Sequence, residues 1–317
     1  MNAAEHVRRL LHDGALDLPP IGAGATRERW RRLAATARCD VATARLAEAH
    51  VDAVQILHEG GRRVDADCLL GVWASESRAH TVRAEPGRDG TLRLHGSKAF
   101  CSGAGIVDAA LVTATHDDTR LLLLVGNDAL DAGRIDTTSW HAHALRDTCT
   151  ATVDLDGITV AADAVVGGPN WYLDRPGFWH GAIGPAACWA GAAYGLIDHV
   201  LAQPAGDAHA RANDGALVAA RWAMASILDA AGDEADRDPS DGAGAHERAL
   251  TARYLIDETC RDVQDRFGRA LGPRAFVADA ALAERFEALT IYRRQCHAER
   301  DLEALGALPR AQPRTTG

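Results

Sequence analysis

Residues 90–115 read GTLRLHGSKAFCSGAGIVDAALVTAT, and this stretch decides the fold. Leu92 and Leu94 alternate with polar residues, as they do in a half-buried strand. Residues 96–98, Gly-Ser-Lys, favour a turn, because glycine tolerates the positive φ that tight turns often need. The apolar run 109–114 then predicts a second strand.

The segment Phe100-Cys101-Ser102 lies between these two predicted strands. In an extended segment, an aromatic ring and a hydroxyl group two residues apart lie on the same side of the sheet. Such a pair can stack on a flat ring and hydrogen-bond to its edge. An ordinary hairpin with Phe100 in the core is the alternative, so the rest of the chain must decide between the two.

Composition excludes several classes of protein. The 317 residues are 47% apolar and 25% charged, which is ordinary for a soluble globular protein. A net charge of −10 argues against nucleic acid or a membrane surface as the main partner. The seven cysteines include no C-x-x-C pair, which favours free thiols over disulfides or a metal site. With no signal segment and no long apolar run, we expect a cytoplasmic protein.

Hydrophobic spacing divides the chain into three predicted domains and an α+β fold. Residues 1–62 have helical spacing, with Asp40 as a cap within them. Residues 63–170 contain short strand-like runs, which predict an antiparallel β domain with a hairpin at Asp156-Gly157. Residues 171–317 return to helical spacing and predict a bundle of about four helices, interrupted by an acidic loop at 232–245.

This order of elements resembles the acyl-CoA dehydrogenase family. Three segments carry the resemblance: VWASE at 72–76, GSKAFCS at 96–102, which is similar to G-x-K-x-W-I-T, and VQDRFG at 263–268, which is similar to V-Q-x-x-G-G. The match covers roughly residues 26–305. It implies N-terminal helices, a central β domain and a C-terminal four-helix bundle, with FAD between the β domain and the bundle.

The resemblance also implies which residues bind FAD. Phe100 would pack beside the isoalloxazine ring, Ser102 would hydrogen-bond to flavin N5, and Ser75 would lie near the pyrimidine edge. Trp73, in the same segment as Ser75, would contact the cofactor or fill the core. Gln264 would reach the FAD of a neighbouring subunit, so we expect a homodimer or homotetramer.

Three features depart from the family pattern. The N-terminal domain is about half the expected length. After Glu76 the chain continues Ser-Arg-Ala-His, where the family has P-x-A-G-S-D to hold the pyrophosphate. Counting from Gly268 to the usual catalytic glutamate gives residues 292–294, none of which is a carboxylate. His297 and Glu299 are then the nearest candidates for proton transfer.

Three functions stay open. The first is an FAD-dependent oxidoreductase that carries out α,β-oxidation of an acyl thioester or a similarly activated small substrate. The second is a flavin-dependent monooxygenase of the same fold, which needs no such glutamate. The third is a catalytically degenerate subunit of a larger assembly.

Overall fold

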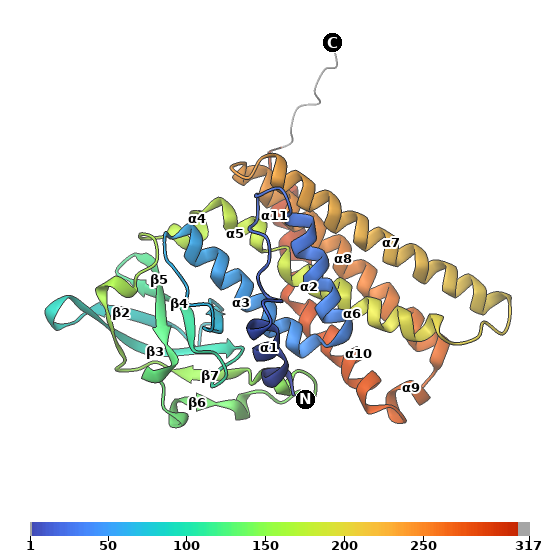
Figure 1. The fold of residues 1–317 in the computed structure, drawn as a ribbon, viewed down its shortest axis with the longest axis horizontal. Helices are drawn as coiled ribbons and strands as arrows, with labels where there is room; N and C mark the ends of the chain where they lie inside the picture. Colours follow the sequence, from blue (N-terminus) through green and yellow to red (C-terminus); the bar gives the residue numbers. More distant parts are fainter. Residues whose placement is uncertain (1, 310–317) are drawn as a thin grey trace, which may run out of the picture.

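The computed structural model describes residues 2–309, and its chain begins with helices (Figure 1). The first three are α1 (Ala3–His12), α2 (Thr26–Cys39) and α3 (Val41–Glu59). The Asp40 side chain accepts a hydrogen bond from the backbone N–H of Thr43 and so satisfies an amide that the helix leaves free. The predicted cap at Asp40 is therefore confirmed.

Eight strands follow and form one sheet. They are β1 (Leu70–Trp73), β2 (Val82–Pro86), β3 (Thr91–Cys101), β4 (Ala109–His116), β5 (Thr119–Gly126), β6 (Ile135–Asp136), β7 (Ala151–Asp154) and β8 (Thr159–Ala161). Most neighbours are antiparallel, but β4 lies between β1 and β2 and runs parallel to both. The predicted sheet is confirmed, with two parallel pairs that the sequence did not indicate.

The turn predicted at residues 96–98 is wrong. β3 continues without a break through these residues, and Gly96 pairs with Val82 of β2. Gly96 has φ +106, and a Cβ there would meet the carbonyl oxygen of Thr81 at 2.1 Å. The glycine is therefore required for a close approach of two strands, and the chain reverses only after Cys101.

The hairpin predicted at Asp156-Gly157 is also wrong. β7 and β8 do not pair with each other, because both lie antiparallel to β3. Gly157 has φ +77 and its N–H donates to the carbonyl oxygen of Leu94. Residues 151–161 thus follow β3 as one strand that is interrupted by a bulge, where glycine supplies the left-handed backbone.

The rest of the chain is helical. Its helices are α4 (Trp171–Asp174), α5 (Pro176–Gly181), α6 (Gly184–Leu201), α7 (Ala208–Arg237), α8 (Gly242–Leu271), α9 (Arg274–Val277), α10 (Ala280–Tyr292) and α11 (Glu299–Ala307). α6, α7, α8 and α10 pack together as the predicted bundle. α10 and α11 are separate helices, because the chain leaves the α-helical path at residues 293–298, where Ala298 has φ +49.

The acidic loop predicted at residues 232–245 is largely helical. α7 continues to Arg237, and α8 begins at Gly242. Several acidic side chains in this segment have partners. Asp236, for example, accepts hydrogen bonds from the backbone N–H of Gly24 and from the N–H and hydroxyl of Thr26. Contacts with the N-terminal segment therefore stabilise a largely helical conformation in residues 232–245, although their composition is typical of a loop.

Figure 1 shows the sheet on one side and the long helices on the other, with α3 between them. α3 packs against β1 on one side and α6 on another. One cluster of buried apolar side chains extends from α1 through the sheet to α10, and a second lies between α3, α4 and the sheet. The three segments share a core, and their division into domains at residues 62 and 170 stays a prediction.

Within residues 2–309, no helix combines the length and the apolar character that a membrane crossing requires.

Candidate active site

Phe100 is the exposed aromatic residue of β3. Its side chain is 62% exposed, and its φ of 59° is left-handed. The register between β3 and β7 shifts between Lys98 and Cys101, so Phe100 lies in a bulge. The prediction that Phe100 and Ser102 share one side of an extended strand is therefore wrong, because the backbone is not extended at Phe100.

Ser102 begins the turn after β3, and its side chain is buried. The Thr150 hydroxyl donates to Ser102 Oγ at 3.1 Å, and Thr150 Oγ1 lies 2.7 Å from Thr148 Oγ1. The indole N–H of Trp73 donates to the Ser102 carbonyl oxygen at 3.0 Å. Among the described residues the hydroxyl proton of Ser102 has no acceptor, so it can donate to a ligand.

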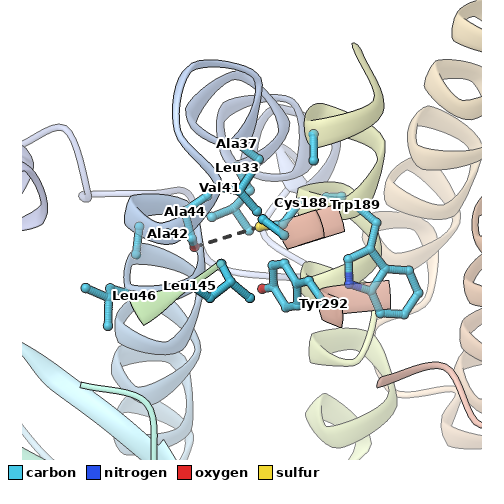
Figure 2. Close-up of a cluster of buried hydrophobic side chains, with 14 of the residues drawn as sticks. Leu33, Ala37, Val41, Ala42, Ala44, Leu46, Leu145, Cys188, Trp189 and Tyr292 are labelled. Atoms are coloured by element: carbon cyan, nitrogen blue, oxygen red, sulfur yellow. Dashed lines mark hydrogen bonds between the residues drawn. The ribbon is translucent and has the colours of Figure 1, made fainter. Parts of the chain in front are cut away.

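The turn that contains Ser102 lies against α3. A Cβ at Gly103 would approach Leu46 Cδ2 of α3 to 3.4 Å. Figure 2 shows Leu145 beside Tyr292 of α10 and below Cys188 of α6, with Leu46 on the other side of α3. The sheet, α3 and the bundle therefore meet at one junction beside Ser102.

Ser75 and Glu76 follow β1 at the edge of this region. Ser75 is half-buried, and Glu76 accepts a hydrogen bond from Arg120 Nη2 at 3.0 Å. Lys98 Nζ lies 3.7 Å from the Glu76 carboxylate, and burial lowers the pKa of this lysine against the effect of Glu76. The chain then closes a short turn, in which the His80 N–H donates to Ser77 Oγ at 3.1 Å.

Gln264 lies inside the chain's own bundle. Its amide nitrogen donates to the Phe286 carbonyl oxygen at 3.0 Å and to the Thr290 hydroxyl at 2.7 Å, and its amide oxygen accepts from Arg293 Nε at 3.0 Å. These bonds tie α8 to α10. Contact of Gln264 with the cofactor of a neighbouring subunit stays a prediction. For that contact, Gln264 would have to give up some of these hydrogen bonds.

His297 and Glu299 lie at the start of α11, and both are exposed. His297 Nδ1 is 3.2 Å from Asp301 Oδ1, so the imidazole is oriented by a carboxylate. Figure 1 shows α11 well apart from β3 and β7. The structure does not bring these two candidates to Ser102.

A buried polar group on α3 was missed by the sequence analysis. Glu48 Oε2 accepts from Arg45 Nη1 at 2.7 Å and from the Tyr292 hydroxyl at 3.4 Å. Burial raises the pKa of Glu48 to about 7, although Arg45 opposes this effect. Glu48 can therefore exchange a proton near neutral pH. The signal was present as Arg45-x-x-Glu48 in an otherwise apolar, alanine-rich helix.

Asp52, one turn after Glu48, extends this polar group. Its Oδ1 is buried and has no hydrogen-bond partner among the described residues. Gly181 faces it closely, since a Cβ there would meet Asp52 Oδ1 at 2.8 Å. Arg29 lines the same narrow interior space, and burial lowers its pKa to about 10. The interface between α3 and the α5–α6 segment is thus polar as well as buried.

Comparison with known proteins agrees with the fold. No family model matches the chain. Dibenzothiophene monooxygenase from Rhodococcus erythropolis is 32% identical over 108 residues, which are 32% of this chain and 26% of that protein. The match therefore spans about a quarter of the length of this curated relative.

Two solved structures are similar over almost the whole chain. TdsC from Paenibacillus sp. A11-2, in complex with FMN and indole, has a TM-score of 0.75 at 18% identity over 96% of this chain and 94% of that one. KijD3, in complex with FMN and dTDP-3-amino-2,3,6-trideoxy-4-keto-3-methyl-D-glucose, has a TM-score of 0.80 at 16% identity over 98% and 88%. The chain therefore has an acyl-CoA dehydrogenase-like fold, as predicted.

The predicted cofactor, FAD, is wrong: TdsC and KijD3 both hold FMN. The turn after Glu76 offers a physical reason. Where the family has a segment for a pyrophosphate, residues 77–80 close on themselves, and His80 Nδ1 lies 2.9 Å from Ser97 Oγ. FMN has one phosphate and no adenosine, so it needs fewer hydrogen-bond donors for phosphate than FAD does.

Proposed function

We propose that this protein is a flavin-dependent monooxygenase that binds FMN and oxygenates a small molecule. The observation that carries the proposal is the segment 100–102, where an exposed, strained Phe100 precedes a buried Ser102 hydroxyl whose proton has no acceptor among the described residues. The likeness to dibenzothiophene monooxygenase and to the FMN complexes of TdsC and KijD3 supports it.

Four residues would hold the flavin in this proposal. Phe100 would cover part of one face of the ring, and Ser102 would donate its proton to a ring nitrogen. Trp73 would orient the turn through its bond to the Ser102 carbonyl oxygen, and Ser75 would lie near the pyrimidine edge. When bound, reduced FMN activates molecular oxygen, of which one atom enters the substrate and the other leaves as water.

Oxidation of an acyl thioester receives less support. That reaction needs a carboxylate beside the flavin to take the α-proton. His297 and Glu299 are exposed at the start of α11, apart from β3. Oxygenation by reduced flavin does not require a carboxylate at the end of the bundle. The exposed positions of His297 and Glu299 therefore favour oxygenation over oxidation of an acyl thioester.

The test first measures FMN binding and then the incorporation of oxygen into the product. We expect the purified protein to bind FMN, followed by quenching of flavin fluorescence, and Ser102→Ala to weaken binding about tenfold through loss of one hydrogen bond to the ring. Ser102→Thr is the matched control, because it keeps the hydroxyl. With reduced FMN supplied by a separate reductase, and indole as the first substrate, the product should carry ¹⁸O from ¹⁸O₂.

Other outcomes would point to the alternatives. Anaerobic reduction of the bound flavin by an acyl thioester, with no oxygen in the product, would favour the dehydrogenase. A protein that takes up no flavin and co-purifies with a larger relative would favour the degenerate subunit. A homodimer or homotetramer stays our expectation, and sedimentation of the flavin-bound protein will measure it.

A further inference from the structure

The exposed side of α7 is uncharged over several turns. Val218 is 54% exposed and Trp222 is 72% exposed, one turn apart on the same side of the helix. Between Asp214 and Asp229 the helix has one charged residue, Arg221, and its guanidinium donates to Asp198 of α6. A helix in contact with water normally carries charged residues on its outer side. The face around Trp222 is therefore unusual for a surface that only water covers.

The neighbouring helix α8 shows the ordinary pattern. Its exposed residues form ion pairs one turn apart, and these pairs are Arg261 with Glu258, Arg266 with Asp262 and Arg269 with Asp265. α7 and α8 have the same length and lie against each other, so their place in the bundle does not explain the difference. Figure 1 shows α7 on the outer side of the bundle, away from the sheet.

A groove lies directly beside Trp222. It occupies about 470 Å³ between α2, α6 and α7, and its apolar lining includes Ala34 and Ala35 of α2 and Ala225 and Leu228 of α7. Ala225 follows Trp222 by three residues, and residues three apart are neighbours on a helix surface. A cavity of about 150 Å³ accommodates benzene, so this groove has room for an indole ring. The chain's own Trp222 does not fill it, because that ring is 72% exposed.

The charged groups beside the groove are paired within the chain. The pairs are Arg27 with Asp233, Arg31 with Asp229, and Arg38 and Arg221 with Asp198, and Glu28 also lies near Arg31. A partner of one dominant charge therefore finds no unpaired counterpart among these residues. A second copy presents the same paired charges, and a two-fold rotation lets arginines face carboxylates. Because the chain has a net charge of −10, two copies repel each other least where such a charge-balanced face meets its own copy.

We propose that this face is the two-fold interface between two copies of the chain, in which Trp222 of each copy enters the groove of the other. Because the ring and the groove lie side by side on one face, a single axis between Trp222 and Ala225 brings each ring to the opposite groove. An unrelated partner would have to supply both a matching ring and a matching groove. The surface does not involve Gln264, whose amide is bonded inside the bundle.

The size of the face is sufficient for a specific dimer. From Asp214 to Asp233 it is about 28 Å long at 1.5 Å per residue, and α7 with the adjoining side of α2 is about 20 Å wide. The footprint is then roughly 550 Å² on each copy and about 1,100 Å² in total. Specific interfaces begin at about 1,000 Å² in total, so the α7 face reaches this limit.

Sedimentation equilibrium of the purified full chain tests the interface. We expect the wild type to be a dimer, or a larger multiple of two, at micromolar concentration. A tryptophan at the centre of an interface contributes roughly thirtyfold to affinity, and Trp222→Ala removes two of them, so the dissociation constant should rise about a thousandfold. Val277→Asp is the control: Val277 is 82% exposed outside this face, so the mass should not change.

A mixing experiment separates the ring from the groove. Trp222→Ala lacks the ring but keeps the groove, whereas Ala225→Trp keeps Trp222 but fills the groove with its own new side chain. Each variant alone should be monomeric at micromolar concentration. An equimolar mixture should associate roughly thirtyfold more tightly than either variant with itself, because the ring of one fits the groove of the other.

Circular dichroism and a cooperative thermal transition establish that each variant is folded. A wild-type chain that is monomeric at submillimolar concentration would overturn the proposal. So would an unchanged mass of Trp222→Ala, or a mixture that associates no better than its components. If the wild type is a larger assembly and Trp222→Ala halves its mass, the Trp222 contact is the one that joins the two halves, as proposed.

Discussion

Two features of Phe100 are unfavourable in free energy, its backbone conformation and the exposure of its ring. A left-handed backbone in a non-glycine residue costs on the order of 1–3 kcal/mol, and a 62% exposed ring leaves apolar area in water. A flat ligand over the ring would recover the second cost by covering that area. Strain of this kind is typical of functional sites.

Phe100→Gly should therefore separate stability from binding. Glycine accepts φ near +60°, so we expect the flavin-free protein to gain about 1 kcal/mol in its free energy of unfolding. The same change removes the aromatic surface, so FMN binding should weaken. Urea denaturation and flavin titration measure the two effects. Phe100→Leu is the control, since it keeps the strain, and a stabilised leucine variant would contradict this explanation.

Glu48 is a second residue whose effect can be isolated. Its pKa is raised to about 7 in the folded protein, from 4.5. The folded state therefore holds a proton that the unfolded state has released, and stability falls as pH rises from 4.5 through 7. Arg45, Tyr292 and Asp52 face this carboxyl group and contribute to the shift.

Glu48→Gln should remove this pH dependence. A shift of this size corresponds to roughly 3 kcal/mol, so the stability of the variant relative to wild type should rise by up to that amount from pH 5 to pH 8. Denaturation curves at several pH values measure it. A difference between the two proteins that is constant with pH would contradict the assignment.

At the scale of elements, α6 decides how the helices come together. Its backbone approaches α2 at Gly191 and the α3 carboxylates at Gly184, where a Cβ would lie 3.3 Å from Glu48 Oε1. Small residues therefore let charged groups be buried between helices. The glycines of α6 lie where this helix comes close to the backbone of another helix or to a carboxylate.

Gly191→Ala should destabilise the protein by about 1–3 kcal/mol, because the new methyl group overlaps the Ala34 carbonyl oxygen. Gly215→Ala in α7 is the matched comparison. Its methyl group enters open space within a helix, so it should stabilise by about 1 kcal/mol. Thermal and urea denaturation of both variants measure the contrast, and equal effects would show that the α2–α6 contact is less close than described.

At the scale of the whole molecule, one apolar cluster joins the N-terminal helices, the sheet and the bundle. α2 in particular packs against both α6 and α7. A chain with a shared core of this kind should not lose its N-terminal helices separately. The predicted boundary at residue 62 therefore describes a change of secondary structure. Whether it is also a domain boundary depends on whether the N-terminal helices unfold separately from the rest of the chain.

Hydrogen exchange measured by mass spectrometry tests this point. We expect amides in the middle of α2 to be protected about as strongly as those of α6, because both lie in the same cluster. The exposed end of α11 serves as the internal reference for fast exchange. Exchange of α2 that is orders of magnitude faster than that of α6 would instead show an independent N-terminal unit.

The sequence by itself determined the order of elements and the fold class. Hydrophobic spacing predicted the N-terminal helices, β4 and the bundle helices, and Asp40 marked a helix start, because these signals depend only on residues close together in the sequence. The resemblance carried by residues 96–102 pointed to a flavin beside Phe100 and Ser102. It also implied FAD, which the FMN complexes of similar structures correct.

The tertiary structure decided what depends on contacts between distant residues. Gly96 and Gly157 looked like turn residues, yet they serve a close strand approach and a bulge. Glu48 was not among the predicted site residues, and only the fold buries its carboxyl group, which raises its pKa. Local pattern cannot specify such effects, because close approach and burial depend on which segments the fold brings together.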